Sequence, residues 1–81
     1  MATFGERLRS LRIEKDLNQE EFGKIFNMAK SRISQYETGK HESDDETKKI
    51  FADYFKVSLD YLMGRSDIRN PEALTLDEEL Q

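Results

Sequence analysis

The fold is decided by residues 19–38, which read QEEFGKIFNMAKSRISQYET. Two helices that cross at a steep angle need a small residue where they come closest. Gly23 supplies it, although glycine inside a helix costs about 1 kcal/mol relative to alanine. The turn between the helices needs a residue that tolerates a positive φ, and Asn27 is one of the few types besides glycine that does. The stretch therefore predicts two short helices joined by a tight turn.

Apolar and polar side chains divide these two helices into an inner and an outer face. The apolar residues are spaced so that both helices can contribute to one core, and they are Phe22, Phe26, Met28, Ile33 and Tyr36. The outer face of the second helix, expected over about residues 29–37, carries Lys30, Ser31, Ser34 and Gln35. These four side chains donate and accept hydrogen bonds in the way that side chains reading the base edges of double-stranded DNA do.

Capping patterns predict where the other helices begin and end. The N-terminal signals are three capping-box pairs and one serine, namely Thr3 with Glu6, Asn18 with Glu21, Ser43 with Glu46, and Ser58. The first helix should end near Lys15, and Gly39 and Gly64 should close two others as left-handed residues. An apolar stripe on the fourth helix comprises Ile50, Phe51, Tyr54 and Phe55. Five short helices predict an all-α, compact five-helix domain.

The charge is distributed unevenly along the 81 residues. Residues 1–40 hold eight Lys or Arg and six Asp or Glu, and residues 41–81 hold five and eleven, so the net charge of −4 divides into +2 and −6. A phosphate backbone responds to local charge, so an acidic second half does not exclude DNA. We expect a domain over residues 1–64 and a linker with a short acidic C-terminal tail over residues 65–81, where Thr75 and Glu78 form a further capping box.

Three blocks of the chain resemble the Cro/repressor-type (lambda-repressor-like, Xre-type) helix-turn-helix family. They are residues 17–22, 33–40 and 57–64, within a resemblance that covers residues 4–64. The resemblance implies a lambda-repressor-like DNA-binding domain and a transcriptional regulator, expected to be a repressor. It also implies a homodimer that binds a palindromic operator, with the third helix in the major groove. A bacterial or phage-encoded cytoplasmic protein is expected, because no apolar run approaches the ~20 residues of a membrane span.

The resemblance assigns roles to individual positions of this sequence. Base-contacting positions are Ala29, Lys30, Ser31 and Gln35, to which the polar face adds Ser34. Phosphate-contacting positions are Gln19 and Lys40, and the basic Arg32 is grouped with them. Arg12 and Glu37 match a supporting ion pair, which we expect to orient the third helix. The likeliest dimer seam is the short fifth helix, through Leu59, Tyr61, Leu62 and Met63.

Several positions depart from the family pattern. Asp16 and Asn27 stand where glycine is common, and both types tolerate left-handed geometry. Ser43 replaces a frequent proline, while Asp45 and Lys48 fall where apolar residues are common. The fourth helix is therefore more polar at its start, which leaves open that this edge faces a partner.

Other kinds of function were weighed against this interpretation. His41 beside Glu42, Asp44 and Asp45 is read as a helix start and not as a metal site, because the chain has one histidine and no second ligand at helical spacing. No glycine-rich phosphate loop or nucleophile–base pair is present in the sequence, so neither an enzyme nor a cofactor is expected. The alternative is an antitoxin-like or anti-regulator module that binds a protein partner through the acidic C-terminal half.

Overall fold

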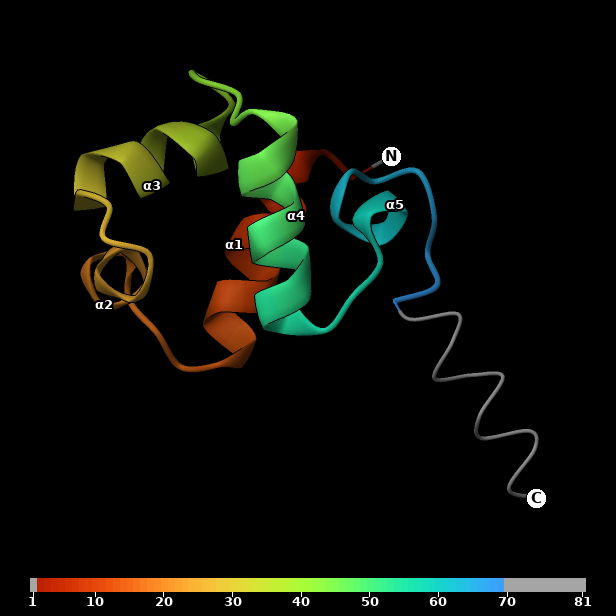
Figure 1. The fold of residues 1–81 in the computed structure, drawn as a ribbon, viewed down its shortest axis with the longest axis horizontal. Coiled ribbons are helices and arrows are strands. Elements are labelled where there is room, and N and C mark those ends of the chain that lie inside the picture. Colours follow the sequence, from red (N-terminus) through yellow and green to blue (C-terminus); the bar gives the residue numbers. More distant parts are fainter. Residues whose placement is uncertain (1, 70–81) are drawn as a thin grey trace.

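Five helices follow one another across residues 2–69, the part of the chain that the computed structural model describes (Figure 1). They are α1 (Phe4–Glu14), α2 (Gln19–Ile25), α3 (Lys30–Thr38), α4 (Asp45–Phe55) and α5 (Leu59–Leu62). These residues contain no strand, so the predicted all-α class is confirmed. None of the five helices is long and apolar enough to cross a membrane.

Three of the predicted N-terminal caps are confirmed. The Thr3 hydroxyl accepts from the Glu6 amide at 3.2 Å, and the Glu6 carboxylate accepts from the Thr3 amide at 3.0 Å. Asn18 and Glu21 form the same reciprocal pair at the start of α2. The Ser58 hydroxyl accepts from the third amide of α5 at 3.0 Å. Each helix start is therefore satisfied by residues within three positions of it.

The predicted cap of α4 is wrong by one residue. Asp44 has the extended backbone of an N-cap, and its carboxylate accepts from the Thr47 amide at 2.8 Å. Ser43 lies one residue earlier and is buried, and its hydroxyl has no hydrogen-bond partner among the described residues. The aspartate wins because its backbone geometry, and not that of the serine, directs a side-chain acceptor at the free amides of the first turn.

The predicted apolar stripe of α4 is rotated in the structure. Its buried residues are Lys48, Phe51, Ala52 and Phe55, which follow the i, i+3, i+4, i+7 spacing of one helical face. Ile50 is 47% exposed and points out of the core. The Lys48 ammonium lies 5.3 Å from the centre of the Phe4 ring and 3.8 Å from the Glu42 carboxylate. Lys48 therefore packs inward, and the expectation that it leaves a polar edge for a partner is wrong.

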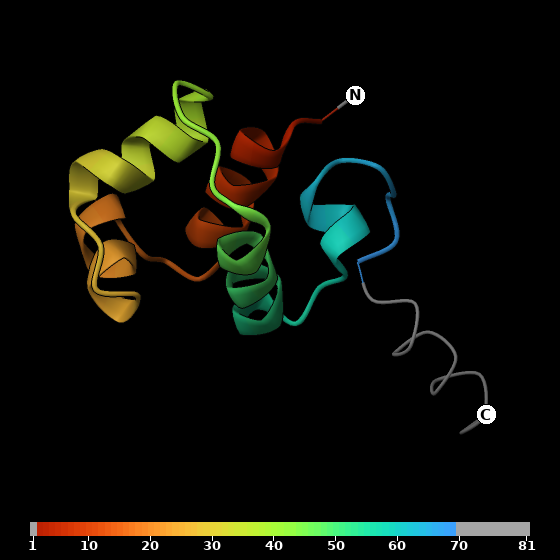
Figure 2. The same cartoon turned by 45° about the horizontal axis from the view of Figure 1, so that its top comes forward.

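Aromatic rings fill the core between the helices. Phe22 of α2 is fully buried, with ring centres 5.5 Å from Phe51 and 5.5 Å from Phe55 of α4 and 5.1 Å from Phe26. α1 and α4 lie side by side in the middle of the molecule, with α2 and α3 at one end and α5 at the other (Figures 1 and 2). The recognition end and the α5 end are thus held apart by the α1–α4 pair.

Residues 65–69, predicted as the start of a linker, are tied back to α1. Arg7 donates to Asp67 at 2.8 Å, and the Arg69 guanidinium makes a two-bond pair with the Glu14 carboxylate. The Arg69 hydrogen bonds lower the pKa of the Glu14 carboxyl below its usual value. The capping box predicted at Thr75 and Glu78 lies outside the described residues.

Candidate nucleic-acid interface

The turn between α2 and α3 is built by the two residues that the sequence singled out. A Cβ placed on Gly23 would lie 2.4 Å from the Met28 carbonyl oxygen, a distance that only glycine allows. Asn27 has φ 58°, in the left-handed region. The Met28 amide donates to the Gly23 carbonyl at 2.8 Å and closes the turn. The predicted roles of Gly23 and Asn27 are confirmed, and together they set the crossing of the two helices.

α3 buries one face and presents the other. Ile33, Tyr36 and Glu37 are buried, and Gly39, with φ 82°, ends the helix as predicted. The residues on the outer side are exposed or half-buried, and they are Ala29, Lys30, Ser31, Arg32, Ser34 and Gln35. Lys40 follows Gly39 and is exposed. The polar face predicted for this helix therefore lies at the surface of one end of the molecule (Figure 1).

A buried carboxylate joins α1, α2 and α3. Arg12 Nε lies 2.6 Å from Glu37 Oε2, and Arg12 Nη2 lies 3.0 Å from Glu37 Oε1, so the structure brings this predicted pair together in bidentate geometry. Gln19 Nε2 donates to the same Glu37 Oε1 at 3.1 Å, and Arg12 Nη1 donates to the Leu17 carbonyl at 2.8 Å. We call Arg12, Gln19 and Glu37 the node. It fixes α3 relative to both preceding helices.

The role of Gln19 in the node was not found from the sequence. Its predicted task was phosphate contact, whereas in the structure it is half-buried and spends one amide hydrogen on Glu37. The side-chain amide retains a second N–H for another acceptor. No spacing rule could reveal this bond, because the two residues are 18 positions apart and on different helices.

Gly5 is a second residue that the sequence analysis missed. A Cβ placed on it would lie 2.5 Å from the Glu37 carbonyl oxygen and 2.6 Å from that of Tyr36. The start of α1 therefore packs directly on the backbone of the last turn of α3. The available signal was a buried-face glycine inside a helix, which is costly unless a backbone passes close by.

Cations without partners gather on the outer side of α3. Elsewhere in the described chain, ion pairs hold Arg7, Arg12, Lys24, Lys48 and Arg69. The side chains of Lys30, Arg32 and Lys40 make no ion pair or hydrogen bond within residues 2–69. Their charges are therefore free to attract a polyanion.

Residues 8–62 match the model of the helix-turn-helix family. This chain belongs to the helix-turn-helix family. The predicted resemblance is therefore confirmed, over the segment that includes the α2–α3 turn and the node.

Relatives of this helix-turn-helix protein include regulators of different kinds. It is 31% identical over 65 residues to the transcriptional activator BcrR of Enterococcus faecalis, covering 80% of this chain and 32% of the relative. It is 32% identical over 71 residues to the cryptic phage CTXphi transcriptional repressor RstR of Vibrio cholerae, covering 88% and 64%. It is 33% identical over 67 residues to the antitoxin PezA of Streptococcus pneumoniae, covering 83% and 42%. The match spans less than two thirds of each relative.

A solved structure shares the fold. The P22 c2 repressor, crystallised in complex with a synthetic operator, superposes with a TM-score of 0.72 at 27% identity. The match covers 82% of this chain and 100% of that one. The lambda-repressor-like five-helix arrangement predicted for this helix-turn-helix protein is thereby confirmed.

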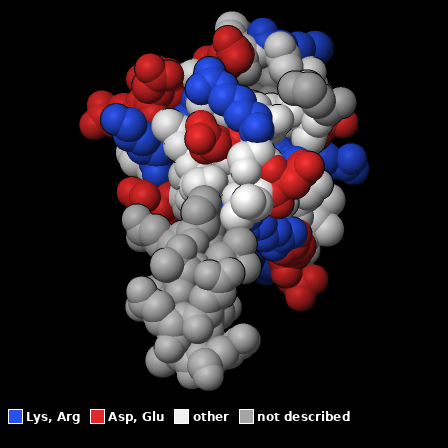
Figure 3. All heavy atoms as spheres, turned by 90° about the vertical axis from the view of Figure 1, so that its right-hand side faces the viewer, with Lys and Arg blue, Asp and Glu red and all other residues white. Residues whose placement is uncertain are grey.

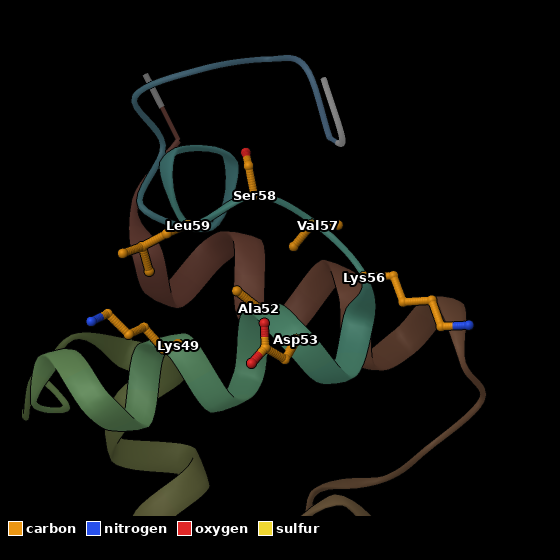
Figure 4. Close-up of a pocket in the computed structure, with 7 residues that line it drawn as sticks. All are labelled: Lys49, Ala52, Asp53, Lys56, Val57, Ser58 and Leu59. Atoms are coloured by element: carbon orange, nitrogen blue, oxygen red, sulfur yellow. The ribbon is translucent and has the colours of Figure 1, made fainter. Parts of the chain in front are cut away.

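The predicted dimer seam on α5 is partly occupied by the core. Tyr61 and Leu62 are 8% and 0% exposed, so their side chains pack within the helix-turn-helix protein itself. Leu59 and Met63 are half-buried and remain reachable. Leu59 lines a groove of about 480 Å³ between α4 and α5, together with Lys49 of α4 and others (Figure 4).

Proposed function

We propose that this helix-turn-helix protein is a sequence-specific DNA-binding transcriptional regulator, not an enzyme, and that it represses transcription with α3 in the major groove of its operator. The observation that carries the proposal is the polar outer face of α3, whose cations are unpartnered and whose orientation is held by the node. The fold shared with the P22 c2 repressor, bound to an operator, and the relation to the repressor RstR support it.

The side chains of the interface divide into two groups by what they can reach. We assign base contacts to Ala29, Lys30, Ser31, Ser34 and Gln35, on the outer side of α3. Lysine can donate to guanine and glutamine can pair with adenine, each good contact contributing about 1–3 kcal/mol of discrimination. We assign phosphate contacts to Gln19, Arg32 and Lys40, which flank that face and position the protein without reading sequence.

We infer that two copies bind a palindromic operator. Two α3 helices would then lie one turn of DNA apart, about 34 Å. Leu59 and Met63, next to the groove between α4 and α5, offer apolar surface for the contact between copies. Leu59→Asp should weaken operator binding and lower the mass of the complex in sedimentation. A single half-site protected by one chain in footprinting would contradict the dimer.

A binding-site selection from a random duplex pool tests the proposal. Wild type should select one palindromic sequence. Lys30→Ala and Gln35→Ala should each relax the preference at one base pair of each half-site and leave the other positions unchanged. Lys24→Ala, which removes a cation of α2 that is paired with Glu20 on the surface, is the control and should select the wild-type sequence. If both α3 variants select the wild-type sites, α3 is not the reader.

The relation to the antitoxin PezA favours a second candidate, a module that binds a protein partner through the acidic C-terminal half. On the face that includes α5, however, acidic and basic side chains alternate instead of forming one acidic field (Figure 3). A partner module would not need the polar face of α3. Unchanged partner binding with Lys30→Ala and Gln35→Ala, combined with no selected duplex, would favour this candidate over the repressor.

A further inference from the structure

Gln19 lies between two hollows at the surface. One, of about 310 Å³, extends toward α3 and is lined by Lys30 and the start of α2. The other, of about 370 Å³, extends toward α1, and its lining includes Arg9, Ser10 and Thr38. Since both hollows share Gln19, together they lead from the first residue of α3, across the start of α2, to the middle of α1.

Arg9 is the charged group of the second hollow that is free to bind. Its side chain is exposed and makes no ion pair or hydrogen bond within the described residues. The two carboxylates that line the hollow are engaged elsewhere. Glu37 accepts from Arg12 and Gln19, and Glu6 accepts from the Thr3 amide.

Neutral donors surround this guanidinium. The Ser10 hydroxyl is exposed, and Gln19 retains one amide hydrogen after its bond to Glu37. A planar guanidinium with nearby hydroxyl and amide donors suits a group with several negative oxygens, and a phosphate is such a group. The strand that borders a major groove holding α3 would run along the same path, because Lys30 opens α3 at the other end of it.

We propose that Arg9 contacts a phosphate of the DNA backbone, with Ser10 and Gln19 as neutral donors beside it, so that the interface extends onto α1. The inference rests on the proposed function and adds a positioning residue to it. Arg9 specifies no base. Its charge instead fixes how far the duplex tilts toward α1 and contributes to the salt dependence of binding.

The test compares Arg9→Gln, Arg9→Lys and a control, Arg65→Gln, on the duplex that wild type selects from a random pool. Arg65 is also exposed and unpaired, but it follows α5 at the other end of the molecule. Affinity is measured over a series of salt concentrations. Arg9→Gln should bind more weakly at low salt and lower the slope of log K against log salt by about 0.9, while selecting the same sequence. Arg9→Lys should restore the slope, and Arg65→Gln should match wild type.

Two results would overturn the inference alone. They are an unchanged slope in Arg9→Gln, and an altered base preference in that variant, which would make Arg9 a reader. Melting temperatures of all variants are measured alongside, and a wild-type melting temperature in Arg9→Gln assigns its lost affinity to the contact itself. A wild-type protein that selects no duplex would overturn the proposed function, and this inference with it.

Discussion

Gln19 Nε2 donates a hydrogen bond of 3.1 Å to Glu37 Oε1, an oxygen that also accepts from Arg12. The first residue of α2 and the last turn of α3 are therefore joined at one carboxylate, whose side chain is 2% exposed. Because an unpaired buried charge is costly, the three side chains of the node hold each other in place. The orientation of the reading helix thus depends on residues that we do not expect to touch a base.

Removing Glu37 should destabilise the fold and weaken DNA binding together. Glu37→Ala leaves the Arg12 guanidinium buried without its partner, and breaking a buried pair costs about 3–5 kcal/mol of the free energy of unfolding. Urea unfolding measures the loss, and binding-site selection should return the wild-type sequence. The control is Glu20→Ala, since the surface pair of Glu20 with Lys24 contributes about 0–1 kcal/mol. An unchanged melting temperature and affinity in Glu37→Ala would make the pair superficial.

Gly5→Ala should be destabilising even though alanine favours a helix. The added methyl would lie 2.5 Å from the Glu37 carbonyl oxygen, so α1 and α3 must separate. Overpacking of this kind costs about 1–3 kcal/mol, against a gain of about 1 kcal/mol in helix propensity. Thermal unfolding measures the difference, with Ser10→Ala on the exposed side of α1 as the control. A more stable Gly5→Ala protein would show that the two helices separate at no cost.

Lys40→Ala should weaken binding to all sequences alike. Lys40 is exposed just after Gly39, where we place a phosphate contact. Losing one such contact lowers the salt slope of the binding constant by about 0.9 and leaves the selected sequence unchanged. Fluorescence anisotropy on the selected duplex and on a scrambled one measures both affinities. A loss confined to the selected duplex would instead make Lys40 a reader of bases.

The Asp44 cap should make stability depend on acid pH. Hydrogen bonds from Thr47 lower the pKa of the Asp44 carboxyl below its ordinary value of 3.8. A carboxyl with a lower pKa in the folded state stabilises the fold above the unfolded pKa, and this stabilisation is lost as the pH falls through the folded pKa. Asp44→Asn keeps an acceptor but does not titrate.

The melting temperature of wild type should therefore exceed that of Asp44→Asn at neutral pH, and the difference should shrink as the pH falls below 3.8. Circular dichroism melts over a pH series measure it. Asp45→Asn changes the neighbouring exposed carboxyl, which accepts no bond from Thr47, and is the control. A difference that stays constant down to the acid end of the series would exclude the charged cap as its source.

The sequence by itself determined the features that depend on near neighbours. Thr3, Asn18 and Ser58 cap their helices through bonds that span three residues. Gly23 and Asn27 set the turn because the allowed backbone geometry is a property of each residue type. The family blocks and the polar face of α3 were readable for the same reason, since helical periodicity places their residues on one side.

Only the tertiary structure decided which faces turn inward and which distant side chains meet. Lys48 is buried and Ile50 exposed because the ring of Phe4, on another helix, offers the lysine stem a place to pack. Glu37 meets Arg12 across 25 positions of sequence and Gln19 across 18. Such contacts depend on how whole helices cross, and helix crossing is set by the packing of all side chains at once, which no local pattern encodes.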